Sequence, residues 1–244
     1  LRNSSAASDV YKRQRLYFVD STTTFRNMTV RNSGDPGQGP HEAGVSIRSS
    51  FFAPTFDGLE VSGSVGPGVH STSGGAMQGS DWVLHNNSKQ GIIVDRATVH
   101  IEGMHLADNG YSGAHVLDAR RVDFWNLTSE NNGASPGASE SEQAGMYYEE
   151  ANDVESSSGD VRCLNCTVSG SQGHGILAAD SVDLWLESIQ LQGNNPNLPA
   201  LEIDNSKVMP AGASGRVHLT NVQVHAESPG QPAVKLDRTA ANVD

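Results

Sequence analysis

The sequence predicts an all-β fold, a right-handed parallel β-helix (solenoid) of about eight rungs with three short strands in each rung. Three observations lead to this prediction. A small residue followed by an apolar-any-apolar triplet recurs along the chain, and a second apolar cluster accompanies most copies. In addition, one position in each copy holds a residue that tolerates a left-handed backbone or makes a turn.

The first expected strand of each rung follows the small residue. Its copies are Gly44-VSI, Gly68-VHS, Gly91-IIV, Gly113-AHV, Gly145-MYY, Gly175-ILA, Ala200-LEI and Ala233-VKL. The intervals between them are 24, 23, 22, 32, 30, 25 and 33 residues. A basic unit of about 23 residues is therefore lengthened by insertions in some copies.

The second and third expected strands form the other apolar cluster. In residues 99–121, Val99 and Ile101 form one period-2 pair, and Met104 and Leu106 form the next. Period 2 is typical of short strands with one inward face. Counterparts in other copies are Phe25/Met28/Val30, Phe56/Leu59/Val61, Phe124/Leu127, Cys163/Cys166/Val168, Leu186/Ile189/Leu191 and Leu219/Val222/Val224.

The expected bend lies just before the third strand. Gly, Asn and Asp dominate this position, and they are the residues that most readily adopt a left-handed backbone. The residues are Asn27, Gly58, Asp81, Gly103, Asn126, Asn165, Ser188 and Asn221. Eight rungs at about 4.8 Å would give a rod of roughly 38 Å.

A leucine-rich repeat is the main alternative fold. Ile101, Met104, Leu106 and Asn109 fit its L-x-x-L-x-L-x-x-N signature. Ser129 breaks this signature in another copy, as does Ser171, and the Gly-led segment has strand character. These departures favour the β-helix.

Residues 1–14, LRNSSAASDVYKRQ, fit no repeat. We interpret them as a translated sequencing adapter from an environmental assembly, or else as a disordered leader, and assign residues 15–244 to the β-helix. The open chain ends suggest a fragment truncated at both ends. Without residues 1–14 the net charge changes from −12 to −14, because three Lys/Arg and one Asp are removed.

Composition excludes several partners. An acidic chain without a basic cluster after residue 15 is not expected to bind nucleic acid through its phosphate backbone. No apolar run approaches the roughly 18 to 20 residues that span a bilayer, so we expect no membrane insertion. No signal peptide is visible.

The repeated N-x-x-x-G element, as in NNSKQGIIV (86–94) and NGYSGAHV (109–116), resembles the pectin-lyase-like superfamily over residues 25–236. The resemblance implies that the Gly-led sheet carries substrate on its outer face, with loops on either side. It also implies an extracellular or cell-surface location. Fold alone does not establish an activity.

Two insertions flank one strand, Gly145-MYYEE. NNGASPGASESEQ precedes it and EEANDVESSSGD follows it. They would form the two walls of a groove or be surface loops without a function.

With the first and third triplet residues inward, one outer row is Ser46, His70, Ile93, His115, Tyr147, Leu177, Glu202 and Lys235. The next is Arg48, Thr72, Asp95, Leu117, Glu149, Ala179, Asp204 and Asp237.

These rows supply the candidate site. Asp95 and Glu149 lie two rungs, or about 9.6 Å, apart, near the upper end of the roughly 6.5–9.5 Å carboxyl separation of inverting glycosidases. The candidate catalytic residues are therefore Asp95, Glu149, His115 and His174, although acidic residues on such a face are commonly only solvated. Candidate substrate-binding residues are Tyr147, His70 and Glu150.

Comparison with particular enzymes of the superfamily gives little support. GHGIL (173–177) resembles the Gly-His-Gly element of polygalacturonases, but no Asp precedes the aligned Gly in earlier copies. Pectate lyases use an Arg or Lys as the base, and the central outer rows contain neither.

The remaining chemistry-bearing residues indicate structure. Cys163 and Cys166 are expected to pack in the core, with a local disulfide as the alternative. The His residues form no ligand triad, so we predict no metal and no cofactor. Trp82 aligns with an inward row, whereas Trp125 and Trp185 are expected at an exposed corner away from the groove.

Two functions of different class remain. The first is a noncatalytic rod or a glycan-recognising segment of a larger extracellular or cell-surface protein, whose partners are a polysaccharide or surface glycan and neighbouring rungs or modules. The second is a polysaccharide lyase or glycoside hydrolase acting in the groove near Tyr147.

Overall fold

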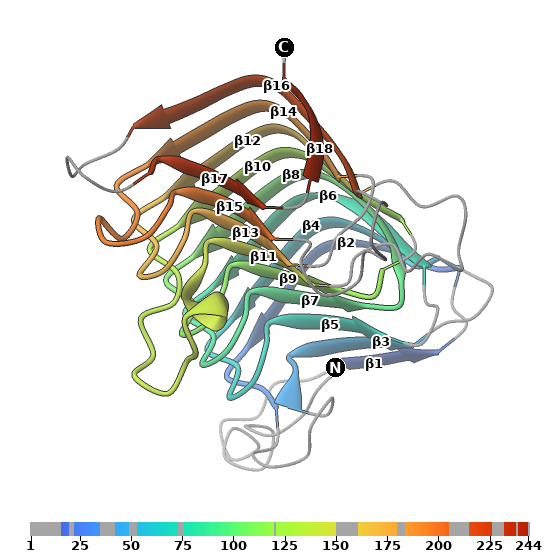
Figure 1. Ribbon diagram of the computed structural model, residues 1–244. Coiled ribbons are helices and arrows are strands. Elements are labelled where there is room, and N and C mark those ends of the chain that lie inside the picture. Colours follow the sequence, from blue (N-terminus) through green and yellow to red (C-terminus); the bar gives the residue numbers. More distant parts are fainter. Residues whose placement is uncertain are drawn as a thin grey trace, which may run out of the picture.

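A computed structural model describes residues 16–19, 22–34, 42–48, 53–72, 76–119, 121–149, 161–179, 184–204, 215–225, 232–237 and 239–243. Within these ranges the chain forms two nine-stranded parallel sheets. The adapter or leader segment assigned to residues 1–14 lies outside the described residues. Figure 1 shows the strands of each sheet stacked in sequence order along one rod.

Sheet A contains the short, Gly-led strands. They are β1 (Leu16–Val19), β3 (Val45–Arg48), β5 (Val69–Thr72), β7 (Ile92–Asp95), β9 (Ala114–Leu117), β11 (Met146–Glu149), β13 (Ile176–Ala179), β15 (Leu201–Asp204) and β17 (Val234–Asp237). The strand β1 extends this sheet by one copy beyond the eight triplets of the sequence.

Sheet B contains the longer strands. They are β2 (Thr24–Arg31), β4 (Thr55–Ser62), β6 (Ala76–His85), β8 (Thr98–Ala107), β10 (Arg121–Glu130), β12 (Val161–Ser169), β14 (Leu184–Gln192), β16 (Gly215–His225) and β18 (Thr239–Val243). Each sheet B strand from β2 to β16 joins the second and third expected strands of its rung across the predicted bend. A 3-10 helix spans Ser141–Gln143 in the loop before β11.

The predicted bend is confirmed at all eight positions. Asn27, Asp81, Asn126, Asn165, Ser188 and Asn221 have φ between 51° and 56°, and Gly58 and Gly103 have φ of 73° and 72°. A second left-handed corner, which the sequence analysis did not identify, follows each of seven sheet B strands. It comprises Asn32, Gly63, Asn86, Asp108, Asn131, Gly170 and Gly193.

The core lies between the two sheets. The first and third residues of the triplets point inward, as predicted, and in β11 these are Met146 and Tyr148, both fully buried. Trp82 is also buried, and its Nε1–H donates to the Phe56 carbonyl oxygen at 2.9 Å. Gly79 makes room for this indole, because a Cβ there would lie 2.4 Å from Trp82 Nε1. The missing side chain at Gly79 is therefore what leaves space for the Trp82 ring in a densely packed core.

Buried asparagines form a column at one corner of the core. Asn87 Nδ2 donates to Asn109 Oδ1, and Asn109 Nδ2 donates to Asn132 Oδ1, both at 2.9 Å. Asn87 and Asn109 are the first residues of the N-x-x-x-G elements noted in the sequence. Their amides satisfy backbone groups that the turn leaves without a strand partner.

Cys163 and Cys166 are buried in the core and joined by a disulfide. They lie on either side of the left-handed Asn165. Both the expected core packing and its alternative, the local disulfide, are therefore present. No helix among the described residues is long and apolar enough to cross a membrane.

Candidate functional site

The pairing register of sheet A confirms the two outer rows predicted from the sequence. Tyr147 of β11 pairs with His115 of β9 and with Leu177 of β13. Glu149 pairs with Leu117, which in turn pairs with Asp95 of β7. These side chains therefore share the outer face of one sheet, because alternate residues of a strand point to the same side.

His115, Tyr147 and Glu149 form the central contact group. His115 Nε2 lies 3.2 Å from Glu149 Oε2 and donates to it when this nitrogen carries the proton. The His115 and Tyr147 rings are stacked, with centroids 4.7 Å apart. Register brings these side chains within reach of one another, since the three residues come from neighbouring strands and rows.

This face is less open than the sequence analysis expected. Tyr147 is only 7% exposed and His70 only 9%, whereas the Glu149 side chain is 39% exposed. Packing of the His115 ring against Tyr147 is one cause. The expectation that His115, Tyr147, Asp95 and Glu149 share one freely exposed surface is therefore wrong for three of them, since the His115 and Asp95 side chains are also only 13% and 17% exposed.

Asp95 belongs to a separate group. Its Oδ2 accepts a hydrogen bond from Thr72 Oγ1 at 3.1 Å, and Arg96 forms a two-pronged contact with the same carboxylate at 2.9 and 3.3 Å. The Asp95 carboxylate raises the pKa of Arg96, chiefly through the hydrogen bond. The Asp95 carboxylate is thus already engaged by Thr72 and Arg96.

His174 lies at the edge of the same face and is nearly fully buried. Its Nδ1 lies 2.9 Å from the Pro199 carbonyl oxygen, which can only accept, so Nδ1 carries a proton. Its Nε2 lies 3.5 Å from Glu140, and Glu202 Oε2 lies 3.7 Å from Nδ1. His174 thus connects the insertion before β11 to β15.

His70 lies in the same outer row, on β5, and its Nε2 is buried without a hydrogen-bond partner within the part of the chain that the structure describes. Burial lowers the pKa of His70, although the nearby Asp95 opposes this shift. Glu150 lies outside the described residues, as does the insertion that follows it. Of the two insertions predicted to form the groove, only the first, residues 131–143, therefore lies within the described residues.

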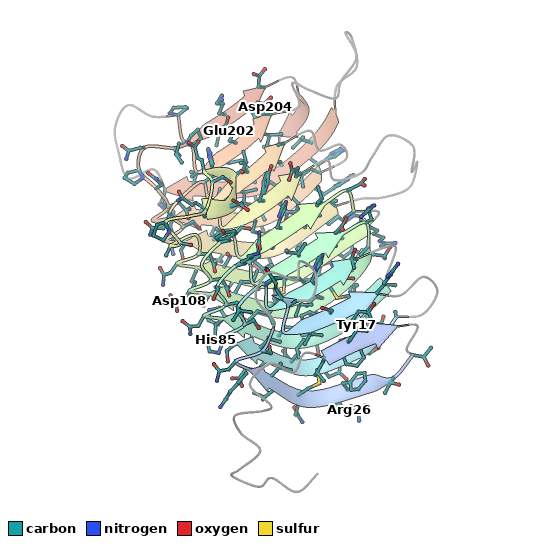
Figure 2. All side chains as sticks on the ribbon, turned by 90° about the horizontal axis from the view of Figure 1, so that it is seen from below. Tyr17, Arg26, His85, Asp108, Glu202 and Asp204 are labelled. Carbon is teal, nitrogen blue, oxygen red and sulfur yellow. A yellow bond between two sulfur atoms is a disulfide. The ribbon has the colours of Figure 1, made fainter. Side chains whose placement is uncertain are left out.

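Three residues without a predicted role contact the candidate catalytic residues. Arg96 contacts Asp95, and Glu140 and Glu202 contact His174. Glu202 stood in the predicted outer row, and Arg96 directly follows Asp95. Glu202 accepts a hydrogen bond from Lys235 Nζ on the neighbouring strand β17. Figure 2 shows Glu202 with Asp204 near one end of the rod, and Tyr17 near the other. Among the described residues, no group of three or more His, Cys, Asp or Glu could hold a metal ion.

Trp125 and Trp185 lie on the outer face of sheet B, away from these groups, as predicted, and each is 39% exposed. The Trp185 ring stacks on His218 with centroids 3.7 Å apart, and the Arg162 guanidinium lies 5.4 Å from the same ring. Arg162 and His218 lie on the two strands that flank β14, so Trp185 is packed from both sides.

A comparison with protein-family models agrees with this architecture. A family model described as a right handed beta helix region matches residues 16–195. Among solved structures, the A-module of the Azotobacter vinelandii mannuronan C-5 epimerase AlgE4 has 12% sequence identity. The alignment covers 93% of this chain and 78% of that chain, with a TM-score of 0.42. No curated protein matches the chain.

Proposed function

The chain belongs to the right-handed β-helix family, and from this premise we propose that it recognises a glycan through the outer face of sheet A. In this proposal it is a noncatalytic segment of a larger extracellular or cell-surface protein. The observation that supports it is a set of polar side chains in one outer row of sheet A. These are His70 in β5, His115 in β9, Tyr147 in β11 and Glu202 in β15, with Ile93 and Leu177 on the intervening strands.

The geometry suits a linear polymer. Five rung steps separate β5 from β15, which corresponds to about 24 Å along the rod. Over this length the outer rows offer imidazoles, carboxylates and a hydroxyl, the kinds of group that orient a ligand by hydrogen bonds. Polar groups spread over this length can contact several units of one chain, whereas a small molecule would contact only some of them.

The disulfide supports the proposed location. Disulfides persist in oxidising compartments and are rare in the cytosol. The Cys163–Cys166 bond is therefore what an extracellular or surface protein would contain.

The binding test is affinity gel electrophoresis with a panel of plant and algal polysaccharides. We expect at least one polymer to retard the protein, and His115→Ala to weaken that retardation about tenfold, because the variant loses the contacts with Glu149 and Tyr147. His100→Ala is the matched control, since His100 lies on sheet B. Equal retardation of His115→Ala and wild type, or no retardation of wild type, would contradict the proposal.

A polysaccharide lyase or glycoside hydrolase remains the second candidate, and the His115–Glu149 contact specifically favours it. A hydrogen-bonded His and carboxylate can move a proton to or from a sugar. Incubation with the same polymers, followed by measurement of new reducing ends and unsaturated products, separates the two functions. Product formation that Glu149→Gln abolishes would replace recognition by catalysis.

A further inference from the structure

The outer face of sheet A carries carboxylates on the strands β7, β11 and β15. They include Asp95 on β7, Glu149 on β11 and Glu202 on β15. Glu140 adds a further carboxylate where it contacts His174 at the edge of the face. A ligand that approaches β11 therefore meets negative potential.

Two cations near this face, Arg96 and Lys235, already contact carboxylates. Arg96 binds Asp95 through two nitrogens. Lys235 donates to Glu202, and this hydrogen bond raises the pKa of the Lys235 amine. A carboxylate on the ligand would have to compete with Asp95 or Glu202 for these cations, at a cost in free energy.

His70 provides an independent indication of a ligand on the same face. Its side chain is nine-tenths buried, and its Nε2 has no partner among the described residues. Burial lowers the pKa of His70, so its imidazole is neutral at neutral pH. A neutral imidazole nitrogen matches a hydroxyl group, whereas it cannot neutralise a carboxylate.

We propose that the sheet A site accepts an uncharged, hydroxyl-rich glycan and rejects polysaccharides that carry carboxylate groups. Sugar hydroxyls can donate hydrogen bonds to the carboxylate oxygens of Glu149 and Asp95, and an ionised carboxylate can only accept them. A uronate would place its own carboxylate beside these oxygens, where neither partner can donate. This inference rests on the proposed function, because it specifies the ligand class of the same site.

Matched polymers of one backbone test this selectivity. The first pair is hydroxyethylcellulose and carboxymethylcellulose, and the second is methyl-esterified and de-esterified homogalacturonan. At neutral pH and low ionic strength we expect dissociation constants at least about tenfold higher for the carboxylated member. Added salt should narrow this difference, because it screens the repulsion.

Two variants test which charge is responsible. Glu149→Gln should shift the ratio of the two dissociation constants about fivefold toward the carboxylated polymer, because it removes one negative charge from β11. Glu187→Gln, on the outer face of sheet B, is the matched control and should leave the ratio unchanged. Thermal melting checks that each variant is folded, and the salt series on wild type requires no substitution.

The outcomes separate the two proposals. If the carboxylated member binds as tightly as the neutral one or more tightly, the ligand class is wrong and the glycan-binding function remains. If the glycan panel and both pairs fail to retard wild type, the proposed function itself is wrong. If the neutral member binds but neither Glu149→Gln nor added salt changes the ratio of the two dissociation constants, the electrostatic explanation is overturned.

Discussion

His70 and Tyr148 illustrate how burial acts on single titratable residues. Tyr148 points into the core, and burial raises the pKa of its hydroxyl well above the ordinary value. His70 points outward but is also buried, and its pKa is lowered. In both cases the low-dielectric surroundings favour the neutral form, so each group is held uncharged at neutral pH.

The shift at His70 predicts a pH dependence of stability. The unfolded chain protonates His70 below about pH 6.5, whereas the folded protein takes up that proton only at lower pH. The stability that His70 confers is therefore complete above about pH 6.5 and is lost as the pH falls through the folded-state pKa. His70→Gln cannot titrate, so it should lose less stability than wild type between about pH 7.5 and 5.5.

Urea denaturation at the two pH values measures this difference. His100→Gln provides the comparison, because the His100 side chain is about half exposed. Equal pH dependence in wild type and His70→Gln would contradict the prediction.

At the scale of elements, the asparagine column connects successive turns. Asn109 is fully buried, accepts from the Asn87 backbone nitrogen and side chain, and donates to the Leu84 carbonyl and to Asn132. Serines occupy equivalent places in other rungs, as at Ser64, whose backbone nitrogen donates to Asn87 Oδ1. Every rung turn thus depends on polar groups contributed by its neighbours.

Asn109→Ala should therefore lower the free energy of unfolding by about 3 kcal/mol, because it leaves several buried donors and acceptors without partners. The measurement is urea-induced unfolding followed by circular dichroism. Asn195→Ala is the control, since Asn195 is exposed and should cost less than about 1 kcal/mol. Similar losses in both variants would show that the column does not carry this stability.

The corners show which elements the sequence can predict. Each strand bend was identifiable because Gly, Asn and Asp recur at aligned positions. The second corner carried the same signal, since it follows the first by five residues in seven rungs, from Asn27 to Asn32 through Ser188 to Gly193. It was not predicted because its residues follow the last apolar position of each unit, where no apolar periodicity marks them.

At the scale of the whole molecule, the rod combines a continuous core with an acidic surface. The chain has 28 Asp and Glu but only 16 Lys and Arg, a net charge of −12. Each sheet B strand from β4 to β14 pairs with the sheet B strands of the preceding and following rungs. Acidic side chains of neighbouring rungs are therefore held close together and repel one another. Net charge far from zero opposes the compact state through self-repulsion.

Added salt should therefore stabilise the folded protein. Between about 0.01 and 0.15 M NaCl the screening length falls from about 30 to 8 Å, which weakens long-range repulsion. Exposed ion pairs such as Arg31–Glu60 lose little, because such pairs contribute about 0–1 kcal/mol. We expect the melting temperature at neutral pH to rise by a few degrees.

Scanning calorimetry with NaCl and, in parallel, with KF at the same ionic strength tests this expectation. Both salts should act alike if screening is the cause. A falling melting temperature would mean that ion pairs outweigh the net repulsion.

By itself, the sequence determined the family, the parallel β-helix, the inward and outward rows, and the left-handed bend. It could do so because these properties depend on local periodicity and on residues with special backbone freedom. Only the tertiary structure decided that His115 contacts Glu149, that Arg96 holds Asp95, and that Tyr147 and His70 are buried. These properties arise between rungs, where register, side-chain packing and distance combine, and no single repeat contains that information.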